Sequence, residues 1–348
     1  MRIIHQLTAS AVPGDAVATQ AFTWRALLRL WGYDGEVIAQ HVHGDFKRRA
    51  IKLRRNDALA RRADALILHY SLWSDAAQVA IESEAALGFV YHNITPGDLL
   101  RPYNPRVADL CDRGRSSLET FRNRCSALIA DSTFNAEELE RIGLAGAEVV
   151  PLVLTLPERP VRSTPVSPPV VLSVGRIAPS KRLDELIRAF AIYQRDWEPA
   201  ASLVLVGSSV GFENYEAELR ALVHELGVEG VNFAGRVARV TRDDWYRKAG
   251  VYASTSVHEG FCVPLVEALA HGIPVVARTA GAVPETLGGA GILLDDRDPT
   301  RFAEALHEAA SSQQTRARLA SAGEARIREL APEKVAGKLR TALEPILA

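Results

Sequence analysis

Cysteine is scarce in this sequence, with three residues in a chain of 348. Cys111, Cys125 and Cys262 lack the short spacing of metal-binding cysteines and the even number that a disulfide framework needs. This pattern indicates a protein of a reducing compartment. Charge of one sign is not in excess either. The formal net charge is −1, which argues against a general nucleic-acid binder, because such proteins are basic overall.

Long apolar runs are also absent. No stretch approaches the ~20 apolar residues that span a bilayer. The apolar start of the chain is broken at His5 and Gln6, unlike the core of a signal peptide, so we expect a cytoplasmic protein. Two fingerprints are missing as well, the G-x-G-x-x-G of dinucleotide-binding proteins and the G-x(4)-G-K-[ST] of P-loop enzymes. Their absence argues against dehydrogenase and P-loop interpretations.

The sequence does contain a regular alternation of short apolar runs and helical patterns. In the first half, strands are predicted over 2–7, 36–40, 65–70, 88–92, 127–131 and 147–154. The stretch 156–169 holds five prolines and is typical of a linker. Beyond it, strands are predicted over 170–175, 202–207, 231–235, 251–255 and 273–278. This alternation predicts βαβ units and parallel sheets.

The expected fold class is therefore α/β, with two Rossmann-like, doubly wound parallel-sheet domains in tandem. The N-terminal domain spans 1–155 and the C-terminal domain spans 170–330. In the last segment, 331–348, Val335, Leu339 and Leu343 recur at helical spacing. These residues are too few to form a core alone, so we expect this helix to cross back to the N-terminal domain. Ligands of such sheets bind beyond the carboxyl ends of the strands.

Two glutamates flank the segment that follows the strand 251–255. Glu259 lies in the loop, and Glu267 lies about one turn into the helix that Pro264 is suited to begin. Gly272 is suited to end that helix. The free N–H groups at the start of a helix form a binding site for an anion. Both carboxylates can therefore face one cleft beside an anion site.

Two cations follow the strand 170–175. Arg176 and Lys181 bracket the loop, and Lys181 falls at the start of the next helix. Two cations and two helix N-termini at one place could neutralise a diphosphate without a metal ion. The carboxylates Glu259 and Glu267 would then accept hydrogen bonds from hydroxyl groups. A ligand with a diphosphate and many hydroxyl groups is a nucleotide sugar.

The stretches "GRIAPSKRLDELIRAF" and "HEGFCVPLVEALAHGIPVVARTAGAVPETLGGAGILL" resemble the donor-binding half of family-4 glycosyltransferases, which are retaining enzymes of GT-B fold. The resemblance implies two Rossmann-like domains that face a cleft. Arg176, Lys181, Glu259 and Glu267 match the G-R-x(4)-K and E-x(7)-E motifs of that family. The resemblance covers most of 165–310. The N-terminal half matches only in outline, through the "PGDA" loop, "LILHYS" and "VYHNITP".

The resemblance implies a role for each matching residue. Glu259 would contact hydroxyl groups of the donor sugar, Glu267 the ribose, and Arg176 and Lys181 the diphosphate. His92 would lie at the sugar. The catalytic residues implied are Glu259, His92, Arg176 and Lys181, with no metal ligand. The donor-binding residues implied are Gly14, Arg176, Lys181, Gly235, Arg236, Val237, Glu259, Gly260, Phe261, Cys262, Val263 and Glu267.

Structural interpretations stand beside these functional ones. A glutamate near a helix start can simply stabilise the helix dipole, and Arg176 and Lys181 could be solvated charges. His92 and His69 could be hydrogen-bonded core histidines. Gly14 could serve only a turn. The "DRD" stretch, 296–298, resembles the metal motif of a different glycosyltransferase fold, but turn and capping chemistry before Pro299 explain it better.

The sequence thus predicts a retaining hexosyltransferase that uses a GDP- or UDP-linked sugar, needs no cofactor or metal, and acts on a glycan, glycolipid or small-molecule hydroxyl. The loop "HEGFCVP" is similar to that of mannosyltransferases that use GDP-mannose. A nucleotide-sugar epimerase of the same architecture and a non-catalytic sugar-binding subunit are the alternatives. The segment 46–62 carries eight cations and one anion, and it could engage an anionic acceptor or the inner face of a membrane. A solvated helix face is the other interpretation.

Overall fold

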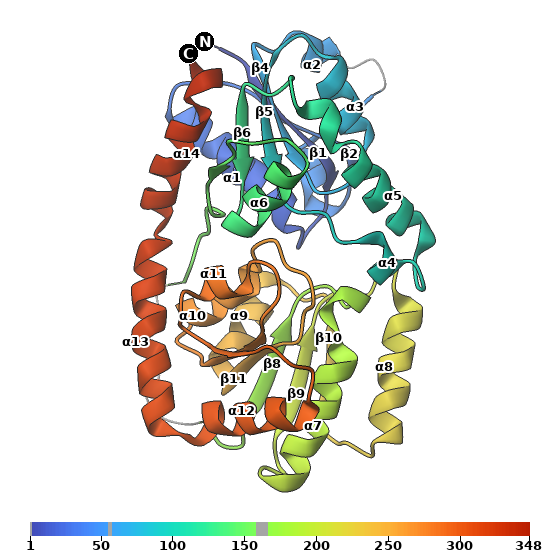
Figure 1. Ribbon diagram of the computed structural model, residues 1–348, viewed down its shortest axis with the longest axis vertical. Coiled ribbons are helices and arrows are strands. Elements are labelled where there is room, and N and C mark those ends of the chain that lie inside the picture. The colour runs from blue at the N-terminus through green and yellow to red at the C-terminus, as the bar shows by residue number, and fades with distance from the viewer. Residues whose placement is uncertain (1, 55–57, 158–165) are drawn as a thin grey trace. The chain divides into compact units, whose positions relative to one another are not determined.

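The computed structural model describes residues 2–54, 58–157 and 166–348 (Figure 1). The chain forms two compact units. Unit 1 comprises Met1–Gly97, Arg106–Leu154 and Leu330–Ala348, and unit 2 comprises Asp98–Pro105 and Thr155–Glu329. The segment Asp98–Pro105 differs from the sequence-based division, because it groups with unit 2 although the first domain was expected to run to residue 155. Most of the expected linker, 158–165, lies outside the described residues.

Unit 1 is built on a seven-stranded parallel sheet with the order β3-β2-β1-β4-β5-β6-β7. Its strands are β1 (Ile4–Ala11), β2 (Val37–Val42), β3 (Ile51–Lys52), β4 (Ala65–Tyr70), β5 (Ala86–Tyr91), β6 (Ala127–Ala130) and β7 (Glu148–Val149). Its helices are α1 (Ala16–Leu30), α2 (Ala58–Arg61), α3 (Asp75–Glu82), α5 (Pro105–Ser116), α6 (Thr133–Arg141) and α14 (Pro332–Leu347), and α4 (Gly97–Leu100) runs into the segment Asp98–Pro105.

Unit 2 is built on a six-stranded parallel sheet with the order β10-β9-β8-β11-β12-β13. Its strands are β8 (Val170–Val174), β9 (Ser202–Val206), β10 (Val231–Gly235), β11 (Val251–Ser254), β12 (Val275–Arg278) and β13 (Ile292–Leu294). Its helices are α7 (Leu183–Asp196), α8 (Glu213–Glu225), α9 (Arg239–Lys248), α10 (Val263–Ala270), α11 (Val283–Leu287), α12 (Pro299–Ser311) and α13 (Gln313–Glu329). The two parallel sheets confirm the predicted α/β class.

Short edge strands are what the sequence pattern did not reveal. β3 has two residues and β13 has three, too few to show a periodicity. The strand expected over 147–154 shrinks to Glu148–Val149 at the other edge of the first sheet. The longer central strands were recognisable because both faces are covered, which makes them nearly continuous apolar runs.

Helix α14 belongs to unit 1 although it follows unit 2 in the chain. It lies against β5 and β6 (red in Figure 1). Val335, Leu339 and Leu343 are at most 2% exposed and join the core cluster that also contains Trp24 of α1. Pro332 occupies its first turn, where the missing N–H is not needed. Among the described residues, no helix is both long and apolar enough to cross a membrane.

The basic segment 46–62 is not one amphipathic helix. Its described part consists of the end of a 3₁₀ turn (Gly44–Arg48), the edge strand β3 and the single-turn helix α2, while residues 55–57 lie outside the described residues. Arg49 stacks 4.6 Å from the ring centre of Phe22, and Ile51 pairs with Ile38 of β2. These packing contacts compete with a continuous helix.

Candidate functional site

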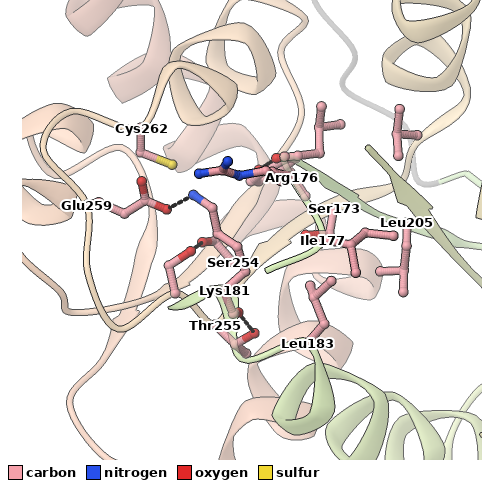
Figure 2. A pocket seen from close by; sticks show the side chains of 15 residues that line it. Ser173, Arg176, Ile177, Lys181, Leu183, Leu205, Ser254, Thr255, Glu259 and Cys262 are labelled. Carbon is pink, nitrogen blue, oxygen red and sulfur yellow. Dashed lines mark hydrogen bonds and ion pairs between the residues drawn. The ribbon is translucent and has the colours of Figure 1, made fainter. Parts of the chain in front are cut away.

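A pocket in unit 2 lies beyond the carboxyl ends of β8 and β11 (Figure 2). Lys181 Nζ is 2.5 Å from Glu259 Oε1, and Figure 2 shows Arg176 directed toward the same place. The Glu259 side chain is 9% exposed and the Lys181 side chain 24%. The polar residues that line the pocket are Ser173, Arg176, Lys181, Ser254, Thr255, Ser256 and Glu259. The structure therefore brings together three of the four motif residues.

Backbone contacts hold Lys181 in place. A 3₁₀ turn, Pro179–Lys181, precedes α7, and Arg182 has a left-handed backbone with φ of 47°. The Thr255 hydroxyl lies 3.0 Å from the Lys181 carbonyl and 2.9 Å from the Arg182 carbonyl, to which it donates. The Val257 N–H donates to the Ser180 carbonyl. The loop after β8 is thus fastened to the loop after β11.

The charges around the pocket favour an ammonium at Lys181. Burial opposes the charge, but the Glu259 carboxylate, through its charge and its hydrogen bond, and the nearby Cys262 favour it, and the pKa of Lys181 is raised. Burial, with a contribution from Glu259, raises the pKa of the Cys262 thiol well above its usual value. Cys262 therefore stays a thiol and is not a nucleophile. Arg176 and Lys181 outnumber Glu259 by one charge, which suits the pocket to an anion.

Cys262 caps α10 with a left-handed backbone, φ 69°. This conformation turns the chain from the Glu259 loop into the helix. Phe261 is buried, and its carbonyl accepts a hydrogen bond of 2.5 Å from the Thr286 hydroxyl. Gly260 and Val263 lie on either side in the same loop-to-helix turn. Cys262, the cap of α10, lines the pocket that contains Lys181, so the N-terminal N–H groups of the helix begin beside this pocket.

Gly281 supports the backbone of Glu259. The Ala282 N–H donates to the Glu259 carbonyl over 2.9 Å, and a Cβ at Gly281, where φ is +53°, would lie 2.3 Å from that carbonyl oxygen. We expect Gly281→Ala to displace Glu259 and lower kcat at least about tenfold, because small misplacements of a positioned group have large effects on rate.

Gly289→Ala is the matched control for this prediction. Gly289 also has a positive φ, +84°, but a Cβ there meets no atom within 4 Å. Both variants should lose about 1 kcal/mol or more of stability from backbone strain. Steady-state kinetics of folded protein separates the two effects. Equal kcat values for the two variants would contradict the supporting role of Gly281.

Glu267 occupies a different position from Glu259. Its Oε1 is 2.9 Å from the Arg242 guanidinium, and its Oε2 accepts a 2.9 Å hydrogen bond from the Tyr246 hydroxyl. Burial raises the pKa of Glu267, and Arg242 and Tyr246 oppose that rise. Glu267 does not line the pocket that contains Glu259. The two carboxylates thus serve neighbouring but separate environments, each with its own cation.

The remaining donor-side candidates are backbone positions at strand ends. Gly235 ends β10 with φ of 64°, and its carbonyl accepts from the Gly207 N–H over 2.9 Å. Arg236 is exposed and Val237 is half-buried after it. Gly14 in unit 1 has φ of 84° just before α1, and a Cβ there would meet open space. None of these four residues lines the pocket around Lys181.

His92 and His69 form a buried hydrogen-bonded string in unit 1. His92 Nδ1 is 2.7 Å from Asp131 Oδ2, His92 Nε2 is 2.8 Å from His69 Nδ1, and His69 Nε2 is 2.7 Å from Gln6 Oε1. Burial, and then His92, lowers the pKa of His69. Burial raises the pKa of Asp131 despite His92.

This string favours the structural interpretation of both histidines. The His92 side chain is 2% exposed and both of its ring nitrogens are engaged. A sugar contact through His92 would have to replace the bond to His69. Asp131 was not predicted as a site residue, although it directly follows β6 and ligands of such sheets bind beyond the ends of the strands. Arg242 and Tyr246, one helical turn apart on α9, gave no signal that they hold Glu267.

No metal site accompanies these groups in the described parts of the chain, where no three His, Cys, Asp or Glu side chains gather as metal ligands would. Asp298 of the "DRD" stretch instead caps α12 by accepting from the Thr300 N–H over 2.8 Å. Turn and capping chemistry therefore accounts for that motif.

Comparisons with known proteins agree with the fold and the motifs. The model of the family described as "Glycosyl transferases group 1" matches residues 157–326. A D-inositol 3-phosphate glycosyltransferase of Xylanimonas cellulosilytica is 28% identical over 306 residues, 79% of this chain and 70% of the relative. A protein of the same description from Kineococcus radiotolerans is 34% identical over 202 residues, 49% of this chain and 46% of the relative.

Solved structures share the architecture over the whole chain. The Anabaena protein HepE in complex with UDP-glucose superimposes with a TM-score of 0.77 at 21% identity, covering 99% of each chain. Sucrose-phosphate synthase of Thermosynechococcus elongatus superimposes with a TM-score of 0.78 at 18% identity, covering 100% of this chain and 99% of the other. With the two parallel sheets, these matches show the GT-B fold, and residues 157–326 are similar to the group 1 glycosyl transferases.

Proposed function

We propose that this protein transfers a hexosyl group from a GDP- or UDP-linked sugar to an acceptor hydroxyl, with retention of configuration and without a metal ion. The observation that carries the proposal is the pair of half-buried Lys181 and buried Glu259, beside Arg176 and close to the start of α10. A diphosphate needs cations and N–H groups, and a sugar needs a hydrogen-bond acceptor at its hydroxyl groups. The HepE complex with UDP-glucose supports a nucleotide sugar as the donor.

In the proposed reaction, Arg176 and Lys181 hold the diphosphate and stabilise the charge that develops on it as the bond to the anomeric carbon breaks. Glu259 accepts a hydrogen bond from the donor sugar and keeps Lys181 in position. Cys262 is a buried thiol, and Lys181 already engages Glu259, the carboxylate of the pocket, so we propose no covalent intermediate. The acceptor proton therefore passes to the leaving phosphate oxygen on the same face.

The test is product analysis by NMR with a nucleotide sugar and a panel of acceptor alcohols. Transfer should give a glycoside with the anomeric configuration of the donor, together with a nucleoside diphosphate. An epimerase would change the donor sugar without any acceptor. A binding subunit would bind the donor and give no product. An inverted product would contradict the same-face mechanism.

Chelation should leave the activity unchanged. Two cations beside the pocket supply the positive charge that a metal ion would otherwise provide. We therefore expect turnover in the presence of excess EDTA to match that in buffer within about twofold. If a metal ion took part, its removal would cost several kcal/mol of transition-state stabilisation and would be seen as a large loss of turnover. Loss of turnover in EDTA with recovery on adding Mg²⁺ or Mn²⁺ would contradict the proposal.

The exposed cations of the basic segment are proposed to engage an anionic acceptor, which the name D-inositol 3-phosphate glycosyltransferase of the relatives also supports. Lys47, Arg48, Lys52 and Arg54 are exposed. Their joint replacement by glutamine should raise the acceptor KM and leave donor affinity unchanged. Flotation with anionic liposomes at low salt tests the alternative, peripheral membrane contact, at about 1 kcal/mol per cation. If the variant matches wild type in both assays, these four cations engage neither an acceptor nor a membrane, and they form only a solvated surface.

A further inference from the structure

Two side chains of α9, Arg242 and Tyr246, hold the carboxylate of Glu267. Arg242 lies 2.9 Å from Oε1 and the Tyr246 hydroxyl donates to Oε2 over 2.9 Å. The two residues are one helical turn apart and therefore share a face of α9. Tyr246 is fully buried and stacks on His271 at 5.0 Å, which fixes its ring. Each carboxylate oxygen thus has one protein partner from a rigid helix.

A carboxylate in this position has capacity left for a ligand. Two oxygens offer about four lone-pair sites, and Arg242 and Tyr246 take two of them. A vicinal diol offers two O–H donors. The Glu267 side chain is 15% exposed, so a ligand could reach the remaining sites. In nucleotide-binding α/β folds, a carboxylate held in place in this way accepts hydrogen bonds from ribose, whose 2′- and 3′-hydroxyls form such a diol.

The ionised form is the one that can accept both hydroxyls. Burial disfavours this form by raising the pKa of Glu267, and Arg242 is the strongest opposing influence. The other groups around the carboxyl are Asp243, which raises the pKa, Arg239, which lowers it, and Tyr252 of β11, a neutral phenol at neutral pH. Without Arg242, a larger fraction of Glu267 would be protonated and would lose acceptor sites.

We infer that Arg242 is a positioning residue for donor binding, which holds the Glu267 carboxylate in place for the ribose diol of the nucleotide. This inference rests on the proposed function, because it takes a nucleotide as the ligand. It adds a residue that lies outside the G-R-x(4)-K and E-x(7)-E motifs. The diphosphate and the reacting sugar are assigned to the pocket around Lys181 and Glu259. Arg242 should therefore affect the affinity for the donor and not the rate of the chemical step.

The test compares Arg242→Gln, Arg242→Lys and Arg247→Gln in calorimetric titrations with UDP and GDP. Arg247 is the matched control, because it lies on the same helix, is 50% exposed and pairs with Asp244. We expect Arg242→Gln to weaken binding of the preferred nucleotide by about 10- to 100-fold, as expected for hydrogen bonds to a charged group. Arg242→Lys should recover part of the loss, and Arg247→Gln should bind like wild type.

The 2′,3′-dideoxy analogues of UDP and GDP separate positioning from a general structural role. Wild type should prefer the ribonucleotide, and Arg242→Gln should lose most of that preference while kcat at saturating donor stays within about twofold. Its affinity should also fall more steeply than that of wild type as pH decreases from 8 to 6, since protonation removes the acceptor. Wild-type affinity and preference in Arg242→Gln would overturn the inference alone. Failure of wild type to bind either nucleotide would overturn the proposed function and the inference together.

Discussion

Lys181→Met should lower kcat/KM by at least about 10²- to 10³-fold, the effect of removing one preorganised donor from a developing negative charge. Lys181 is the cation that Glu259 holds over the pocket at 2.5 Å, and its raised pKa keeps it charged at neutral pH. Methionine retains the length of the side chain and removes only the ammonium. The loss should appear in the affinity for a nucleoside diphosphate as well, whereas a nucleoside without phosphates should bind unchanged.

Arg188→Met is the control for Lys181→Met. Arg188 lies on the exposed face of α7, the helix that follows Lys181 directly. Replacement of this cation by methionine also removes one positive charge from the same region, but Arg188 does not line the pocket. Its kinetics should match wild type. A Lys181→Met enzyme with more than about one tenth of wild-type kcat/KM would contradict the role of Lys181 at the diphosphate.

Glu259→Gln should impair turnover more strongly than Glu267→Gln. In the proposed reaction, Glu259 contacts the sugar, where charge changes, so its loss should lower kcat and kcat/KM together, by about 10²-fold or more. Glu267 is proposed to contact the ribose, so its loss should mainly raise the donor KM. Glutamine preserves the shape of both side chains, which makes each variant the control for the other.

Steady-state kinetics at varied donor concentration distinguishes these roles. Glu259→Gln also removes the ionic partner of Lys181, and a thermal melt will report that loss separately from catalysis. The reverse ranking, with a larger kcat defect in Glu267→Gln, would show that the assignment of the two carboxylates is wrong.

The sequence predicted the architecture and the charged residues of the Lys181 pocket, Arg176, Lys181 and Glu259, but not how they pair. Long parallel strands are nearly continuous apolar runs, so the two sheets could be read directly from the chain. The strand-end rule placed Lys181 and Glu259 in neighbouring loops, and the structure brings them into contact although 78 positions separate them. Helix α14 could be anticipated from three apolar residues at helical spacing.

Features without a periodic signal could not be predicted. Arg242 looks like any charged residue on an exposed helix, and only the packing of α9 against α10 reveals its bond to Glu267. His92 follows a strand as a site residue would, yet its nitrogens are satisfied by Asp131 and His69, which only the neighbouring strands bring near. The run of cations in 46–62 suggested a helix, but packing of Arg49 on Phe22 and pairing of β3 prevail.

The most direct test of the proposed donor site is a thermal-shift panel in which wild type and Lys181→Met are melted with UDP-, GDP-, ADP- and TDP-linked sugars. At least one UDP- or GDP-sugar should stabilise the wild type, by about 2.7 kcal/mol at a ligand concentration of 100 Kd. The same sugar should give no comparable shift with Lys181→Met. Without ligand, the two proteins should differ in stability only by the loss of the Lys181–Glu259 pair. If no nucleotide sugar stabilises the wild type, or if Lys181→Met is stabilised equally, the donor does not bind at Lys181.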